Sequence, residues 1–484
     1  MLPQPAAGAP AAAGEATLVR GLGTLDATLL TVGSVVGTGI FLTTSDIARV
    51  LPRGGWILAV WVAGGLLTLA GALTYAELGA MFPRAGGIYH YLKEAYGPLP
   101  GFLFGWACFL IIMSGGAAAL AVGFGEYLAS FVPAAASDNV LLRVPLGARE
   151  WTFSGAQAAA ILAILGLTAV NHVGLRAAAG VQNALTLAKI GAIVALGVLA
   201  FVVPSVPRAT AAGAAAAAAP AMPAGGALLA AFGVAMIAAL WTYDGWYGLT
   251  ISAGEVRDPG RVLPRGLIGG IGLVLALYLL ANFAYLRALS PAEIAAQPRV
   301  AEAAAAALGG PLAARAVAAA VLVSTFGCLH ATILYSSRIY QPMAADGLFF
   351  RSLAVVDPRF RVPVRSLWAQ SAWACLLAAS GTYAQLYTYV IFASVVMHAA
   401  TAAAVFVLRR RAPELPRPYR VWGYPLVPAL FILGSLLMIG NTLLERPIES
   451  IAGLGLLALG LPAYALFRGR SRREARTAAG RGAA

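Results

Sequence analysis

Residues Thr31–Thr43 read TVGSVVGTGIFLT, and this stretch decides how the rest of the chain is interpreted. It interrupts an apolar run, Leu25–Leu51, that is long enough to cross a bilayer. Gly33, Gly37 and Gly39 each lower helix propensity by up to about 1 kcal/mol relative to alanine. Open backbone survives in hydrocarbon only where protein buries it or where it lines a cavity. The stretch therefore predicts a binding site near the middle of a membrane.

The composition is typical of a membrane protein with many spans. Of the 484 residues, 60% are hydrophobic and 11% are charged, and the mean hydropathy is +0.81. Such a chain has room for about a dozen spans of about 20 residues. The net charge of +14 would suit nucleic acid or an anionic partner, but its distribution along the chain favours the membrane. We therefore expect membrane lipid, and no nucleic acid, as a partner.

Successive apolar runs predict twelve transmembrane helices. The ninth and tenth are the hardest to divide, because residues 366–408 contain no Asp, Glu, Lys or Arg. A tight turn at Ser380-Gly381-Thr382 is expected to separate them. The twelve runs are Leu25–Leu51, Trp56–Phe82, Phe102–Phe131, Phe153–Val170, Val181–Val203, Ala227–Ala253, Leu267–Leu286, Leu312–Ile339, Leu367–Ser380, Tyr383–Leu408, Leu426–Leu444 and Ile451–Phe467.

The positive charges predict the orientation. If the N-terminus is cytoplasmic, most of the 33 Lys and Arg residues lie in cytoplasmic connections, which supports a protein of the cell (inner) membrane with both termini inside. Residues 1–16 are rich in Ala, Pro and Gly and lack the basic start and cleavage pattern of a signal peptide. The expected division is a disordered cytoplasmic leader (1–22), a first five-helix repeat (23–204), an Ala/Pro-rich external loop (205–226), a second repeat (227–408), two appended helices (409–467) and a basic cytoplasmic tail without structure of its own (468–484).

A second break lies in the sixth run, at Trp241–Trp246 (WTYDGW). Two interrupted helices, each opening a set of five spans, indicate an inverted repeat. Because five is odd, the second set enters from the opposite side and the two breaks meet at the midplane. The predicted fold is an all-α integral membrane protein of twelve transmembrane helices, with a 5+5 inverted repeat and discontinuous helices 1 and 6.

The two breaks together predict a receptor for a zwitterion. The outer half of the first helix starts with unpaired N–H groups near Gly37, Thr38 and Gly39, and its positive dipole end suits a carboxylate. Ser34 adds a hydroxyl group. The opened turn of the sixth run exposes carbonyl groups that accept from an ammonium, so an α-amino acid is the expected ligand. The alternative is that the glycines only allow close helix packing. A dinucleotide-binding turn is rejected, because the strand and the acidic residue of that fingerprint are missing.

Several side chains near the breaks are candidates for function. Trp241 could close over a ligand as a gate, or simply pack, and the same holds for Tyr243 and Trp246. Asp244 is an ionisable group at membrane depth, which suggests function, although it could instead cap the freed N–H groups of the sixth helix. Lys189 lies roughly 13 Å into the fifth run. Its ammonium could bridge runs one and eight as a sodium ion does elsewhere, carry a proton, or snorkel to the cytoplasmic face.

The remaining reactive residue types give no catalytic pattern. His330 and His398 are isolated within runs, and we interpret them as satisfied core histidines, with a proton relay as the less favoured alternative. The three cysteines, Cys108, Cys328 and Cys375, have no metal-ligand spacing and fall inside apolar runs. No paired carboxylates and no Ser/His/Asp arrangement stand out within a span. We therefore expect neither an enzyme, nor a cofactor, nor a metal.

Three motifs resemble the amino acid–polyamine–organocation (APC) superfamily of permeases. GSVVGTGIF at Gly33–Phe41 is similar to its first-helix signature, and PRAGGIYHYLKEAYG at Pro83–Gly97 to the loop after its second helix. Leu240–Gly266 is similar to its sixth helix and the loop that follows. The TYDGW pattern resembles the AYxGW of L-type amino acid transporters and their bacterial relatives. The resemblance implies a leucine-transporter-like fold and an amino acid permease.

The resemblance also implies roles for individual residues. A lysine matching Lys189 occurs in sodium-independent members, which implies an exchanger or a proton-coupled symporter, with a proton or a counter-substrate as second partner. Asp244 adds a charge where many relatives are neutral, so a polyamine or organic-cation exchanger stays an alternative, as does an amino acid sensor. The sequence specifies neither the amino acid nor a partner subunit. The implied substrate-binding residues are Ser34, Val35, Val36, Gly37, Thr38, Gly39, Trp241, Tyr243, Asp244 and Gly245, with Trp241 and Trp246 as gate and Lys189 as coupling residue.

Overall fold

The computed structural model describes residues 21–84, 86–146, 149–173, 178–203, 221–357 and 362–481, and most of them are helical. In this described part, ten helical segments are long and apolar enough to cross a membrane. The first run is broken into shorter helices, and the ninth forms a helix of 17 residues. The chain therefore has a predominantly helical membrane architecture, with one two-stranded antiparallel hairpin in the described part.

The first half of the described chain contains the broken first helix and a helix with a π-helical turn. Residues Cys108–Ile112 form this turn, η1, between α6 and α7. The elements are α1 (Thr24–Val35), α2 (Gly39–Leu42), α3 (Thr44–Val50), α4 (Gly54–Met81), α5 (Ile88–Tyr96), α6 (Pro98–Ala107), α7 (Met113–Leu128), η2 (Pro133–Ala135), β1 (Val140–Leu146), β2 (Arg149–Ser154), α8 (Gly155–Val173) and α9 (Ala178–Val202).

The second half contains a second broken helix and a helix bent at Gly310, whose φ of 73° is non-helical. The turn predicted at residues 380–382 is confirmed, since α16 ends at Ser380 and α17 begins at Tyr383. The elements are α11 (Gly226–Tyr243), α12 (Gly248–Ile251), η3 (Ala253–Glu255), α13 (Pro259–Ala288), α14 (Pro291–Ala296), α15 (Val300–Ala345), η4 (Arg351–Leu353), α16 (Val364–Ser380), α17 (Tyr383–Arg411), α18 (Leu426–Glu445), α19 (Pro447–Ala458) and α20 (Gly460–Arg481).

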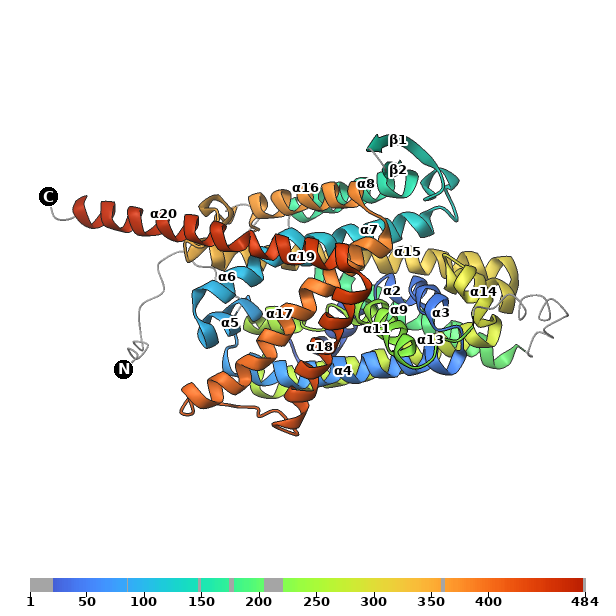
Figure 1. Cartoon of the computed structure of the whole chain (residues 1–484), viewed down its shortest axis with the longest axis horizontal. Coiled ribbons are helices and arrows are strands. Elements are labelled where there is room, and N and C mark those ends of the chain that lie inside the picture. The colour runs from blue at the N-terminus through green and yellow to red at the C-terminus, as the bar shows by residue number, and fades with distance from the viewer. Residues whose placement is uncertain are drawn as a thin grey trace.

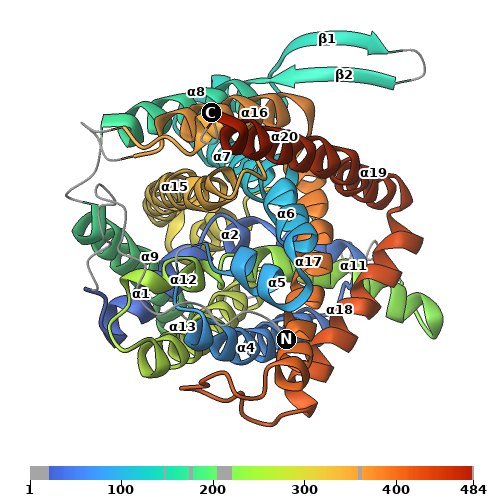
Figure 2. The same cartoon turned by 90° about the vertical axis from the view of Figure 1, so that its left-hand side faces the viewer.

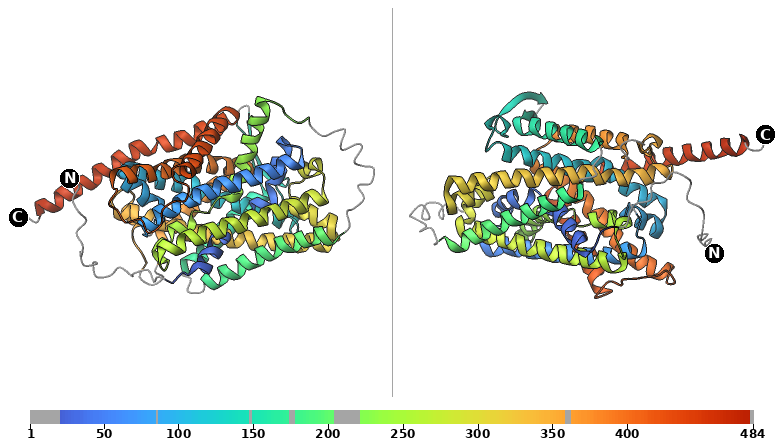
Figure 3. Two further views of the ribbon diagram at one scale, coloured as in Figure 1. Left: turned by 90° about the horizontal axis from the view of Figure 1, so that it is seen from below. Right: turned by 180° about the vertical axis from the view of Figure 1, so that it is seen from behind.

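The long helices lie side by side along the longest axis of the molecule (Figure 1). We call the end with β1, β2 and α14 the hairpin end, and the end with α5 and the last turns of α20 the tail end. Figure 2, viewed from the tail end, shows α2 near the centre, with α7, α8, α15 and α16 on one side of it and α4 and α13 on the other. In Figure 3 (right), the yellow helix α15 runs along nearly the whole molecule. The two breaks, whose residues are mostly buried, therefore lie inside the bundle.

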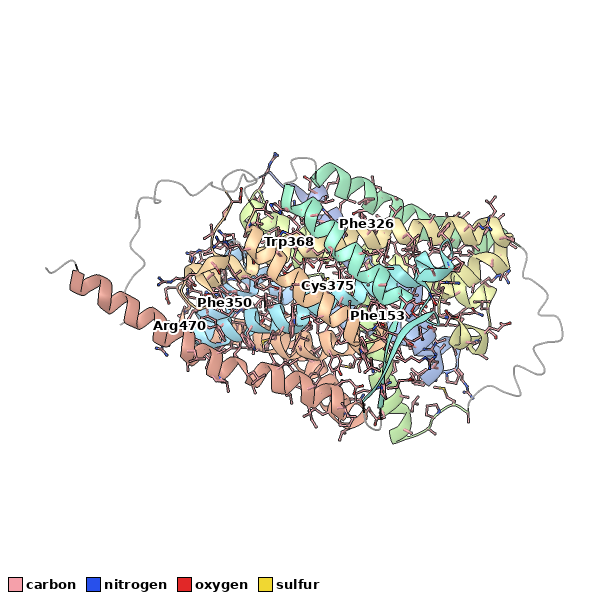
Figure 4. The ribbon with its side chains drawn as sticks, turned by 90° about the horizontal axis from the view of Figure 1, so that it is seen from above. Phe153, Phe326, Phe350, Trp368, Cys375 and Arg470 are labelled. Atoms are coloured by element: carbon pink, nitrogen blue, oxygen red, sulfur yellow. The ribbon has the colours of Figure 1, made fainter. Side chains whose placement is uncertain are left out.

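Large apolar side chains point outward from the bundle. Phe326 on α15 is 44% exposed and Trp368 on α16 is 37% exposed, and both appear on the same outer face in Figure 4. Leu437 on α18 is 66% exposed. Such a surface would be unfavourable in water and matches the hydrocarbon of a bilayer.

Two features differ from the sequence-based expectations. Leu22 was placed in a disordered leader, but it forms an isolated parallel bridge with Val256 and accepts a hydrogen bond from the Arg257 N–H at 3.1 Å. The segment expected to be an unstructured tail continues α20 as a helix to Arg481, because its Ala, Arg and Glu residues are good helix formers. The rest of the leader, and residues 205–220 of the expected external loop, lie outside the described residues.

Candidate functional site

The first helix is interrupted where the glycines predict it. Helix α1 ends at Val35, residues 36–38 are not helical, and α2 begins at Gly39. The carbonyl groups freed at the end of α1 are bound by side chains from other helices. Lys189 on α9 donates to the carbonyl oxygens of Gly33 at 3.2 Å and Val36 at 3.0 Å. A cation is well placed at this negative end of a helix.

Lys189 therefore does not snorkel to a membrane surface. Its side chain is buried, and its ammonium points at the break. On the α15 side, the Cys328 thiol lies close to the ammonium and also approaches the Ser34 carbonyl oxygen at 3.6 Å. Lys189 thus joins the fifth run to the first at the break, which is one of the alternatives that its position left open.

The other side of the first break presents N–H groups. Within the described part of the chain, the backbone N–H groups of Gly37, Thr38 and Gly39 have no hydrogen-bond acceptor. Helix α2 is followed after one residue by α3, so the N–H groups lie at the start of a nearly continuous helical segment. Unpaired N–H groups at such a start attract an anion.

The second break faces the first at very short range. Helix α11 ends at Tyr243, and α12 begins at Gly248. Gly245 has a φ of +92°, and a Cβ atom there would lie 2.5 Å from the Ser34 carbonyl oxygen. A Cβ atom on Gly39 would lie 2.6 Å from the Thr242 hydroxyl oxygen. Only glycine fits these two positions, because the backbone at each break lies in direct contact with residues of the other break.

A cavity of about 40 Å³ lies between the breaks, and we call it the central cavity. The Asp244 carboxylate is its only charged group among the described residues, and no side chain caps α12. The Asp244 carboxylate accepts hydrogen bonds from the Gly245 backbone N–H and the Tyr247 hydroxyl, so the capping role for the opened turn is seen in part. The lining residues are Ser34, Val35, Gly37, Thr38, Gly39, Ile112, Met113, Gly116, Leu120, Trp241, Thr242, Asp244, Gly245, Tyr247, Cys328, Thr332 and Tyr335.

Aromatic side chains close the central cavity towards the hairpin end. The Trp241 indole N–H donates to the Tyr383 hydroxyl at 2.8 Å, and this hydroxyl lies 3.3 Å from the Thr38 hydroxyl. Trp241 also stacks on Tyr387, whose hydroxyl donates to Asp46 at 2.8 Å. We call Trp241, Tyr383 and Tyr387 the aromatic gate.

A wide hollow lies on the other side of the aromatic gate. It has a volume of about 630 Å³ and contains Tyr383, the carboxylates of Asp46, Glu126 and Glu150, and residues of β2. Asp46 is paired with Arg49. One layer of aromatic side chains therefore separates the central cavity from the hairpin end of the molecule.

A polar cluster joins α5 to the segment that follows α15. Lys93 on α5 pairs with Asp346, just after α15, at 2.6 Å. Tyr89 donates a hydrogen bond to the same carboxylate, and its burial together with this bond raises the pKa of Tyr89 well above the usual range. Tyr89 therefore stays a neutral donor at ordinary pH.

Most of the predicted substrate-binding residues come together. Ser34, Val35, Gly37, Thr38, Gly39, Trp241, Asp244 and Gly245 all line the central cavity. Three predicted residues do not. The Val36 carbonyl binds Lys189, and Tyr243 packs on Trp61 and donates to its carbonyl oxygen. Trp246, predicted as a gate, points away from the cavity and packs on Tyr75, because the turn at Gly245 carries its ring to the other side of the backbone.

Other residues of the site were not predicted. Tyr383 and Tyr387 stand four residues apart at the start of α17, so they share one helix face, which was the available signal. Thr332 and Tyr335 on α15, and Met113 beside the π-helical turn, supply further walls. Single π-helical turns often mark functional sites, but they have no clear sequence pattern.

Comparison with known proteins agrees with this architecture. The profile of a family described as amino acid permease matches residues 22–452. The chain is 31% identical to a serine/threonine exchanger of Bacillus subtilis over 95% of this chain and 98% of that protein. It is 29% identical to the mouse large neutral amino acids transporter small subunit 2, over 96% of this chain and 83% of the relative. It is also 29% identical to the mouse b(0,+)-type amino acid transporter 1, over 93% and 88% respectively.

Proposed function

Because the chain belongs to the amino acid permease family of the APC superfamily, we propose that it is a secondary active transporter that moves an α-amino acid across the cell membrane by alternating access. The observation that carries the proposal is the cavity between two helix breaks, with unpaired N–H groups on one wall and Asp244 on the other. Broken helices that meet inside a bundle are the usual binding architecture of such transporters.

The walls of the cavity fit the two charged ends of an amino acid. The N–H groups of Gly37, Thr38 and Gly39 would hold the carboxylate, assisted by the nearby Lys189 ammonium. The Asp244 carboxylate would accept from the substrate ammonium. The side chain of the substrate would then lie against α7 and α15, where Met113 and Thr332 face the cavity.

The cavity must open for the substrate to enter or leave. One water molecule needs about 10–15 Å³ measured in this way, so about 40 Å³ holds a few waters rather than an amino acid. The aromatic gate would open towards the 630 Å³ hollow, and the Lys93–Asp346 pair would separate on the other side. Rocking between these two openings is alternating access.

The geometry of Lys189 supports transport that does not need sodium. Its ammonium binds two carbonyl oxygens at the end of α1, where a fixed cation makes a bound metal cation unnecessary. Coupling would then come from exchange for a counter-substrate or from a proton.

The contact pattern supports twelve crossings with a 5+5 inverted repeat. Helix α1 packs on α9 and α13, and α11 packs on α17 and α4, which are the corresponding helices if the repeats begin at α1 and α11. The two half-helices also pair crosswise, α2 with α11 and α1 with α12. With an even number of crossings both termini would lie on the same side, and the distribution of Lys and Arg favours the cytoplasm for that side.

Asp244 also favours a second candidate, exchange of polyamines or organic cations. A carboxylate in a cavity suits an ammonium group on a ligand that has no carboxylate of its own. Counterflow of labelled amino acids and polyamines in proteoliposomes distinguishes the candidates. We expect amino acid counterflow without sodium. Polyamine flux alone would favour the second candidate, and binding without flux would favour an amino acid sensor.

A further inference from the structure

A second, smaller cavity lies behind the second break, and we call it the rear cavity. It has a volume of about 30 Å³ and is enclosed by α4, the break, α17 and α18. Asp244 belongs to the walls of both cavities. The polar groups of the rear cavity are Thr68, Asp244, Ser394, His398 and Ser435.

His398 has one nitrogen bonded and one free. Its Nδ1 lies 2.7 Å from the Tyr75 hydroxyl, and its Nε2 has no hydrogen-bond partner within the described chain. The side chain is 5% exposed, so bulk water does not reach it. If Tyr75 donates to Nδ1, then Nε2 carries a hydrogen that needs an acceptor. If Nδ1 donates to Tyr75, then Nε2 is a lone pair that needs a donor. The satisfied core histidine expected from the sequence is therefore only half satisfied.

The rear cavity has the size and polarity for water. Its volume exceeds the 10–15 Å³ that one water needs. The Ser394 hydroxyl is also buried without a partner among the described residues. A water there would contact His398 Nε2, Ser394 and Asp244, which gives it the two to four polar partners that buried waters need.

We propose that Asp244 and His398, joined by water in the rear cavity, form a proton-binding site that couples amino acid movement to a proton. This inference rests on the proposed function and names its coupling ion. In the empty transporter, the proton resides on the Asp244 carboxyl group. When the substrate ammonium pairs with Asp244, the O–H bond of the Asp244 carboxyl group breaks. The proton passes through the water to form an N–H bond at His398 Nε2, which carries a lone pair in the tautomer whose Nδ1–H donates to Tyr75. On the side where the substrate is released, the His398 N–H bond breaks and the proton passes to water. The Asp244 carboxylate takes up the next proton from water on the other side, so one proton crosses with each substrate and transport is symport.

Asp244 and His398 are the groups in the described walls of the rear cavity that can bind the proton. Among the described residues that line the two cavities, no Lys or Arg occurs, and Asp244 is the only carboxylate. The titratable neighbours are Tyr75 on α4 and Tyr247, which donates a hydrogen bond to the Asp244 carboxylate. Cys328 and Tyr335 of α15 line the central cavity, and Tyr91 of α5 and Cys108 of η1 lie further out near Tyr75. Helix α18 contributes Phe431 and Ser435, which do not titrate. Phenols and thiols carry their proton at ordinary pH, so they can relay a proton but do not bind an additional one.

The test uses proteoliposomes that contain a trapped pH dye. We expect wild type to acidify the lumen when a transported amino acid is added outside, and an inside-alkaline gradient of one unit to drive up to about tenfold accumulation. His398→Gln should abolish both effects while keeping exchange of one amino acid for another. His330→Gln, which changes a half-buried histidine on α15 outside both cavities, is the matched control and should behave as wild type.

The outcomes separate the two proposals. If wild type exchanges no amino acid, the proposed function fails. If it exchanges amino acids without moving protons, or if H398Q still moves protons as wild type does, only the proton site is overturned. A thermal melt of H398Q checks folding, and His398→Asn serves as a second variant. Should neither variant fold, the proton-to-substrate ratio of wild type decides, with a ratio near one in support and zero against.

Discussion

Replacing Lys189 by alanine should stop most transport while leaving the protein folded. The ammonium donates two hydrogen bonds to carbonyl oxygens of the interrupted α1, at 3.2 and 3.0 Å. Without the ammonium, these carbonyl groups lose their hydrogen-bond donor inside the bundle, which destabilises the interrupted conformation of the first helix. The variant therefore tests whether the break depends on a fixed cation.

The size of the effect follows from the two bonds. A hydrogen bond to a charged group contributes about 1.5–3 kcal/mol, and water entering the space left by the side chain would restore part of the loss. We take about 2–3 kcal/mol for the net loss, which lowers the population of the open break about 30- to 150-fold. The unfolding temperature should change little, because removing a buried charge also removes its desolvation penalty.

The assay is sodium-free counterflow in proteoliposomes, with thermal unfolding in detergent as the check on folding. Leu187→Ala is the matched control, since Leu187 lies on the same helix and its side chain is 58% exposed on the outer face. We expect L187A to transport at nearly the wild-type rate. If K189A keeps more than half of the wild-type rate, the ammonium does not hold the break.

Three further predictions concern the walls of the central cavity. Gly245→Ala should lower the free energy of unfolding by about 1–3 kcal/mol and remove counterflow, because its Cβ atom would lie 2.5 Å from a carbonyl oxygen at a φ of +92°. Gly191→Ala is the control, since its Cβ atom would have no neighbour within 4 Å. Equal unfolding temperatures of the two variants would contradict the close contact. Cys328 lines the cavity, so a small thiol reagent should inactivate the transporter and substrate should protect it, whereas Cys375→Ser should leave this reaction unchanged. Trp241→Ala should raise KM about tenfold or more and speed the labelling of Cys328 from outside, because it removes a ring of the aromatic gate; labelling at the wild-type rate would argue that the other aromatic side chains suffice.

The sequence predicted the positions of both breaks. For Lys189 it left three alternatives open, and the hydrogen bonds of Lys189 fit the one in which it binds at the first break. These features have local signals in the sequence. Glycines within an apolar run, or a single cation at membrane depth, can be recognised from a few neighbouring residues. The turn at Gly381 could be predicted for the same reason. A departure from uniform apolar sequence is therefore a dependable guide to where a membrane helix changes.

The direction in which a side chain points was harder to predict. Trp246 follows directly on a glycine with positive φ, and this turn sends its ring to the rear cavity instead of the aromatic gate. His398 and Tyr75 are separated by 323 positions, so their bond has no local signal. In helices that are apolar on all sides, periodicity does not tell which face meets which neighbour.

The backbone contact between the two breaks limits how this transporter can be redesigned. Since no added atom fits at Gly39 or Gly245, neither break can be altered without displacing the other. Engineering a new substrate range should therefore begin at Met113, Leu120 and Thr332, which line the central cavity from α7 and α15. Larger or smaller side chains there would change the shape of the central cavity. They would leave in place the groups at the two breaks that are proposed to bind the substrate carboxylate and ammonium.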